Sequence, residues 1–135
     1  MATLRIYDLD GGVLAVHLSR LLDLLAPKSL DAEWTVAQLR SDGEDKFEAT
    51  GSGAAELEEL VATAMPISGM ALLIVATNTH QIVWGEFIAI VPGESTPWLT
   101  LRAIDSTFYE IGTDDADALA KIKSAYKDVR IADTP

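Results

Sequence analysis

Three short apolar segments in the second half of the chain are separated by turn residues, and this arrangement limits the folds that the chain can adopt. Residues 82–91, 98–104 and 108–111 are rich in β-branched and aromatic side chains. Residues 92–97 read Pro-Gly-Glu-Ser-Thr-Pro and residues 105–107 read Asp-Ser-Thr, so both connections are typical of turns. Strands joined by such short connections pair antiparallel. The sequence therefore predicts an antiparallel meander here.

Residues 70–76 are a continuous run of apolar side chains. A run of this length is too short for most helices and is typical of a strand that is buried on both faces. We therefore expect these residues to form the central strand of the sheet. Gly85 interrupts the strand at residues 82–91, which indicates either a bulge or a close packing contact.

Apolar residues with helical spacing predict three helices, at residues 13–26, 54–65 and 115–126. Thr113 is expected to cap the last of them. Residues 34–40 and 46–49 flank the sequence Ser-Asp-Gly-Glu, in which Asp-Gly favours a tight turn, so we expect a β-hairpin there.

These elements predict a single α+β domain over residues 1–135. Its mainly antiparallel sheet should have about five to seven strands, with three helices packed on it. Residues 129–131 are expected to add a short strand at one edge of the sheet. Such an edge could join two copies of the chain into a homodimer.

The charge of the chain indicates what kind of partner it can bind. Asp and Glu number 21 against 10 Lys and Arg, which gives a net charge of −11. This charge disfavours nucleic acid and anionic membranes, and it favours a basic protein. The absence of cysteine fits a reducing cytoplasm, and the N-terminus has no signal-peptide pattern. We expect a cytoplasmic protein with no cofactor.

One segment has the residues of a known catalytic motif. The sequence Tyr-Asp-Leu-Asp-Gly-Gly at residues 7–12 resembles the first motif of haloacid-dehalogenase-type phosphohydrolases. The resemblance implies a Mg²⁺-dependent enzyme in which Asp8 is the nucleophile and Asp10 the general acid and base. Thr77 would bind phosphate, and Asp114 and Asp115 would lie near the metal. The metal site would then include Asp8, Asp10 and Asp114.

The chain also departs from that family. It has no lysine between residues 46 and 121, where the phosphate-binding lysine of the family is expected. The predicted meander also differs from the alternating strands and helices of those enzymes. The leading hypothesis is therefore a non-enzymatic domain, and the phosphohydrolase is an alternative.

Acidic side chains are the candidate binding residues of this domain. One cluster contains Asp42, Glu44 and Asp45, and a second contains Glu56 and Glu59. We add Trp98, because tryptophan is enriched in interface hot spots and this one follows a Pro/Gly-rich loop.

The hypothesis is thus a small bacterial protein of the inhibitor or immunity type that binds a basic partner through these residues. A small-molecule sensor or a homodimeric scaffold is a further alternative.

Overall fold

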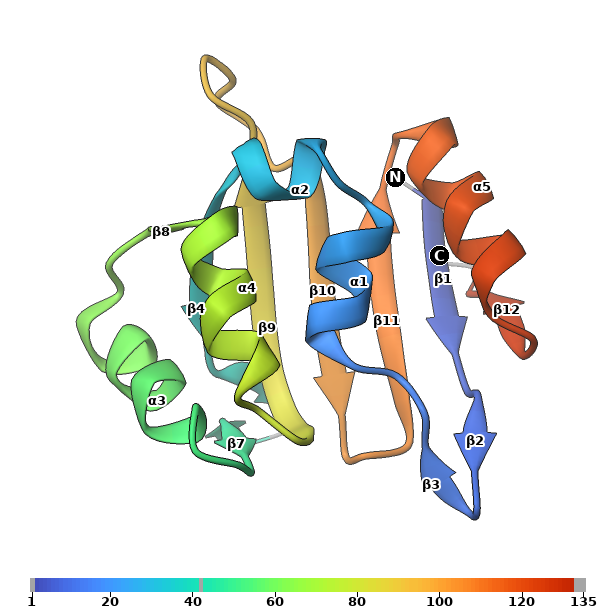
Figure 1. Cartoon of the computed structure of the whole chain (residues 1–135), viewed down its shortest axis with the longest axis horizontal. Coiled ribbons are helices and arrows are strands. Elements are labelled where there is room, and N and C mark those ends of the chain that lie inside the picture. The colour runs from blue at the N-terminus through green and yellow to red at the C-terminus, as the bar shows by residue number, and fades with distance from the viewer. Residues whose placement is uncertain (1, 42, 133–135) are drawn as a thin grey trace.

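The computed structural model describes residues 2–41 and 43–132, and they form an antiparallel sheet with helices on one face (Figure 1). The main strands are β1 (Ala2–Ile6), β4 (Glu33–Ala37), β7 (Glu48–Ala49), β8 (Ile67–Ser68), β9 (Ile82–Ile90), β10 (Leu99–Ile104), β11 (Phe108–Thr113) and β12 (Val129–Ile131). Their order across the sheet is β12-β1-β11-β10-β9-β4-β8, and β7 also pairs with β9. The predicted fold class is confirmed, and β12 is an edge strand as expected.

Five helices are present among the described residues, against the three predicted. They are α1 (Leu18–Leu24), α2 (Lys28–Asp31), α3 (Ala54–Thr63), α4 (Gly69–Thr77) and α5 (Ala116–Ala125). Figure 1 shows α1, α2, α4 and α5 in front of the sheet, with α3 beside its β4 edge. The predicted helices correspond to α1, α3 and α5, whereas α2 and α4 were not expected.

The predicted central strand at residues 70–76 is wrong, because this segment is the helix α4. Ser68 begins the helix, since its hydroxyl accepts a hydrogen bond from the backbone N–H of Ala71 at 3.1 Å. A segment that is apolar at every position has neither the period of a strand nor that of a helix. The capping serine was the local signal for the helix, and the middle of the sheet is β10.

The first predicted helix starts later than expected. Two short strands, β2 (Leu9–Asp10) and β3 (Val13–Leu14), form a hairpin before α1. Its turn contains Gly11 and Gly12, which adopt φ angles of 60° and 81°. Glycine adopts these left-handed angles without a steric penalty, so the chain reverses here instead of entering the helix.

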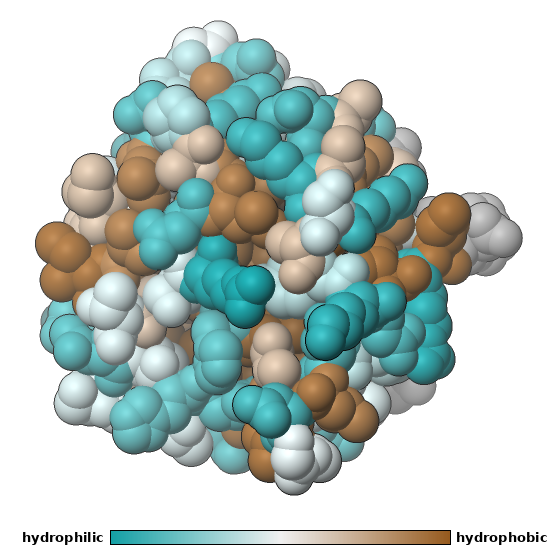
Figure 2. All heavy atoms as spheres, turned by 45° about the vertical axis from the view of Figure 1, so that its right-hand side comes forward, coloured by the Kyte–Doolittle hydropathy of each residue, from teal (hydrophilic) through white to brown (hydrophobic). Residues whose placement is uncertain are grey.

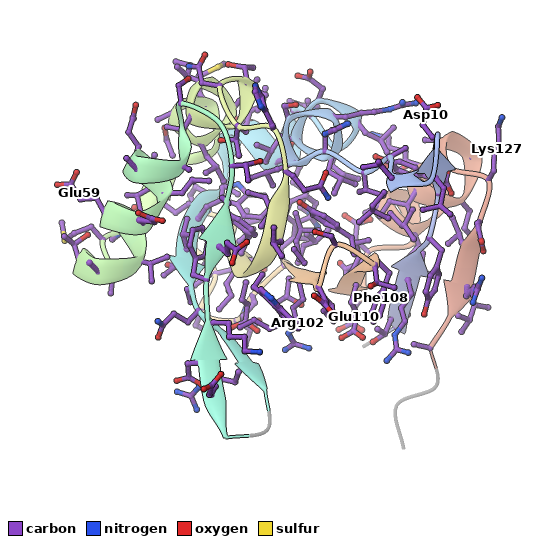
Figure 3. The ribbon with its side chains drawn as sticks, turned by 90° about the horizontal axis from the view of Figure 1, so that it is seen from below. Asp10, Glu59, Arg102, Phe108, Glu110 and Lys127 are labelled. Atoms are coloured by element: carbon purple, nitrogen blue, oxygen red, sulfur yellow. The ribbon has the colours of Figure 1, made fainter. Side chains whose placement is uncertain are left out.

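The predicted hairpin near residue 42 is present, but it leaves the main sheet. Its strands are β5 (Leu39–Ser41) and β6 (Glu44–Lys46), and they form a separate two-stranded sheet. Gly43 has a φ of 82°, as the Asp-Gly turn predicts. Figure 3 shows this hairpin projecting away from the helices. Gly85 marks a close packing contact, because a Cβ there would lie 2.9 Å from the Phe47 ring.

The start of α4 depends on a glycine for its packing against α2. A Cβ on Gly69 would overlap the carbonyl oxygen of Ser29 and lie 2.7 Å from Cα of Leu30. We expect Gly69→Ala to lower the free energy of unfolding by about 2 kcal/mol or more. Denaturant unfolding measures this, and Met70→Ala, at an exposed position of the same helix, is the matched control. Equal stability of the two variants would contradict this packing.

Candidate functional site

The sheet face opposite the helices carries a row of alternating charges. Arg5, Glu110, Arg102 and Glu86 lie directly opposite one another on β1, β11, β10 and β9. Glu110 accepts hydrogen bonds from Arg5 Nε at 3.0 Å and from Arg102 Nη1 at 3.1 Å. Glu86 accepts from Arg102 Nε at 2.7 Å. We call this set the charged row, and Figure 3 shows Arg102 and Glu110 on the side away from the helices.

The hydrogen bonds of the charged row stabilise the charged form of its arginines further. The bond to Glu110 raises the pKa of Arg5, and the bond to Glu86 raises the pKa of Arg102. The sequence analysis did not identify this row. The sequence signal for this row is a charged residue among the solvent-facing positions of a strand, such as Arg102 and Glu110 on neighbouring strands. In a half-buried sheet every second side chain of a strand faces solvent.

The β5–β6 hairpin and this sheet face enclose a groove of about 940 Å³, which we call the open-face groove. Its lining is Ala37, Gln38, Leu39, Arg40, Trp84, Glu86, Ile88, Arg102, Ile104 and Glu110. This lining contains no histidine, cysteine, serine or threonine. Its two carboxylates, those of Glu86 and Glu110, both accept hydrogen bonds from Arg102. An indole, aliphatic side chains and guanidinium groups suit the binding of a molecule that has an apolar body and a polar group.

Two of the residues that the phosphohydrolase resemblance implies, Asp8 and Thr77, make structural hydrogen bonds. The Asp8 carboxylate accepts hydrogen bonds from the backbone N–H groups of Lys127 and Asp128, at 2.9 Å and 2.7 Å. It thereby joins the loop after β1 to the turn after α5. Asp10 lies on the exposed β2–β3 hairpin (Figure 3), and the Thr77 hydroxyl donates to the carbonyl of Ile74 at 2.7 Å.

The structure does not gather Asp8, Asp10 and Asp114 into a metal site. Asp8 follows the end of β1, whereas Asp114 lies beside the start of β1, because Ala2 is opposite Thr113. A strand of this length separates its two ends by about 15 Å. Among residues 2–41 and 43–132, no three His, Asp or Glu side chains form a group that could hold a metal ion.

Asp115 caps α5, so the prediction that Thr113 would be the cap is wrong. The Asp115 carboxylate accepts hydrogen bonds from the backbone N–H groups of Asp117 and Ala118. It also accepts from the indole of Trp98 at 2.9 Å and from Lys28 at 3.2 Å. Trp98 is 8% exposed, so the free protein shows little of its side chain, and its role in partner binding stays a prediction.

The contacts of Asp115 predict that the free energy of unfolding depends on pH. The Trp98 hydrogen bond is the main cause that lowers the pKa of Asp115 to about 2. We expect Asp115→Asn to lower the free energy of unfolding by about 1 kcal/mol at neutral pH. Because the pKa of Asp115 is lower in the folded state, its ionised carboxylate stabilises the protein above pH 4. This stabilisation is lost as the pH falls toward 2.

Unfolding of wild type and variant between pH 7 and pH 2 measures this effect. The difference between the two proteins should shrink as the pH falls below 4. Asp117→Asn is the control, because the Asp117 carboxylate is 78% exposed in its pair with Lys121. A difference that stays constant with pH would contradict the assignment.

The acidic residues of the hairpin and of α3 belong to two elements that adjoin at the base of the hairpin. The base of the hairpin and α3 share a concavity of about 480 Å³, lined by Gln38, Phe47, Glu58, Val61 and Ala62. We call Glu44, Asp45, Glu56, Glu58 and Glu59 the acidic edge. Figure 3 shows Glu59 pointing away from the body of the molecule. Asp42 lies outside the described residues.

Among the described residues, few ion pairs involve the acidic edge. Glu44 lies 3.9 Å from Lys46, whose ammonium also lies over the Trp84 ring at 4.7 Å. In the described part of the chain, no ion pair includes Glu56 or Glu59. The field of these carboxylates is therefore directed outward to solvent.

Comparison of the chain with models of protein families, with curated proteins and with solved structures gives no match. None of the helices in the described residues is long and apolar enough to cross a bilayer. Figure 2 shows apolar side chains reaching the surface among hydrophilic ones, seen obliquely with the α5 side turned forward.

Proposed function

We propose that this protein is a non-enzymatic binding domain that engages a basic protein partner through the acidic edge. The observation that carries the proposal is the set of outward carboxylates on α3 that have no ion pair among the described residues, in a chain with a net charge of −11. Such a field accelerates the encounter with a positively charged protein and orients it. A cytoplasmic bacterial inhibitor or immunity protein that blocks a basic toxin domain is one concrete form of this function.

The test measures how tightly a basic protein is retained by the immobilised domain, with and without substitutions in α3. Wild-type protein and Glu56→Gln/Glu59→Gln are compared as bait. We expect the affinity of the retained basic protein to be about tenfold lower for the variant, because two attractive charges are lost. Between 50 and 500 mM salt the wild-type affinity should fall, since salt screens exposed charges.

Asp10→Asn/Glu94→Gln is the matched control, because these exposed carboxylates belong to the β2–β3 hairpin and the loop after β9. It should bind as the wild type does. Equal affinity of the α3 variant and the wild type, or an affinity that is independent of salt, would refute the proposal.

The open-face groove favours a second candidate function, that of a small-molecule sensor. Its volume of about 940 Å³ suits a small ligand, and Leu39, which is 5% exposed, closes one side over the sheet. Arg40 would favour an acidic group on that ligand, since Arg102 is already paired with Glu86 and Glu110.

Anilinonaphthalene sulfonate, an apolar ring system with one acidic group, is a suitable probe of this groove. We expect saturable binding that Ile88→Gln weakens about tenfold, because a polar amide replaces an apolar wall of the groove. Fluorescence titration measures it. The control is Ile74→Gln, on the opposite side of the sheet, which should leave the dissociation constant unchanged. Equal effects of both variants would count against a site in the groove.

A further inference from the structure

The outer side of α4 is an apolar surface without a partner in the described chain. The helix reads Gly-Met-Ala-Leu-Leu-Ile-Val-Ala-Thr, and its inner side buries Leu72, Val75 and Ala76. On the outer side Met70 is 54% and Ile74 61% exposed. A helix that is apolar all round is ordinarily buried all round, so the outer side of α4 is suited to contact another molecule.

A groove lies between α3 and α4, and Val75 lines it on the α4 side. Its volume is about 300 Å³, and its lining is Glu56, Glu59, Leu60, Thr63, Met65, Ile67 and Val75. Met65 is 61% exposed and follows the end of α3. Methionine adapts its shape to different apolar partners, which suits a binding surface better than a rigid core.

Charged groups in the groove indicate the sign of the partner. Glu56 and Glu59 are three residues apart on α3, so both carboxylates lie on one side of the helix. Neither has an ion pair among the described residues. A ligand that fills this groove contacts Met65 and Val75 and must also approach these carboxylates, so it needs cationic groups beside its apolar groups.

We propose that the α3–α4 groove binds a basic amphipathic helix of the protein partner, an inference that rests on the proposed function. The apolar side of that helix covers Met65, Met70 and Ile74, and its Lys or Arg side chains pair with Glu56 and Glu59. The nine residues of α4 extend over about 13 Å, which is the length of two to three helical turns. Helices with anchors at positions i, i+4 and i+7 bind in this way.

The probe is a peptide of about 18 residues made only of Leu and Lys, with the leucines on one side of a helix. Two peptides serve as controls: the same composition in scrambled order, and the amphipathic order with Glu in place of Lys. We expect the amphipathic Leu–Lys peptide to bind at least tenfold more tightly than the scrambled one. The Leu–Glu peptide should not bind, because Glu56 and Glu59 repel it.

Variants locate the peptide on the groove. Met70→Gln/Ile74→Gln should weaken the amphipathic peptide about tenfold, whereas Leu9→Gln, at a 66% exposed apolar position of the β2–β3 hairpin, should change its affinity less than twofold. Glu56→Gln/Glu59→Gln should weaken the peptide and reduce the dependence of its affinity on salt. Equal loss in Met70→Gln/Ile74→Gln and Leu9→Gln would overturn the assignment to this groove.

The remaining outcomes separate the inference from the proposed function. If the scrambled and amphipathic Leu–Lys peptides bind equally well, both through Glu56 and Glu59, the inference that the partner binds as a helix is wrong. The proposal of a basic partner then still holds. If neither peptide bound at low salt, both proposals would fall. A dimer that Ile74→Gln abolishes in light scattering would identify a second copy as the occupant. Sedimentation with phosphatidylcholine vesicles that depends on Met70 and Ile74 would identify a membrane. Either result would overturn the inference.

Discussion

The register of the antiparallel sheet is the constraint on which the rest of the structure depends. Phe87, Leu101, Ile111 and Leu4 lie opposite one another on the covered face, and one residue further along the same strands lies the charged row. A shift of one residue in any pair would bring arginine or glutamate under the helices and leave apolar side chains in water. The cost of burying these charges therefore determines which side chains lie on each face of the sheet.

The helices then cover one face of the sheet but leave their own outer surfaces open. The α4 helix buries Leu72 and Val75 on its inner side, while its outer side remains apolar and exposed. Beside it α3 carries Glu56 and Glu59, which have no ion pair among the described residues. Stability alone requires neither feature, because polar residues on α4 and lysines on α3 would serve the fold equally well. Their combination supports a binding surface for a basic amphipathic partner.

Part of the candidate site could be predicted from the sequence. The acidic residues of α3 follow from composition and helical spacing, since charged residues on an amphipathic helix lie on its solvent side. The exposed apolar side of α4 could not be predicted, because Met70 and Ile74 were placed in a buried strand. The resemblance of residues 7–12 to a catalytic motif made Asp8 a nucleophile only in the alternative hypothesis, and its contact with the backbone of Lys127 and Asp128 shows a structural role.

The sequence by itself determined the elements whose signals are local. Alternating side chains and turn residues defined β9, β10 and β11, helical spacing defined α3 and α5, and the excess of carboxylates defined the charge. The tertiary structure decided whether residues 70–76 became a helix or a strand, where the β5–β6 hairpin projects, and which carboxylates lie together. These outcomes depend on contacts between residues that are distant in the chain, and local periodicity carries no information about such contacts.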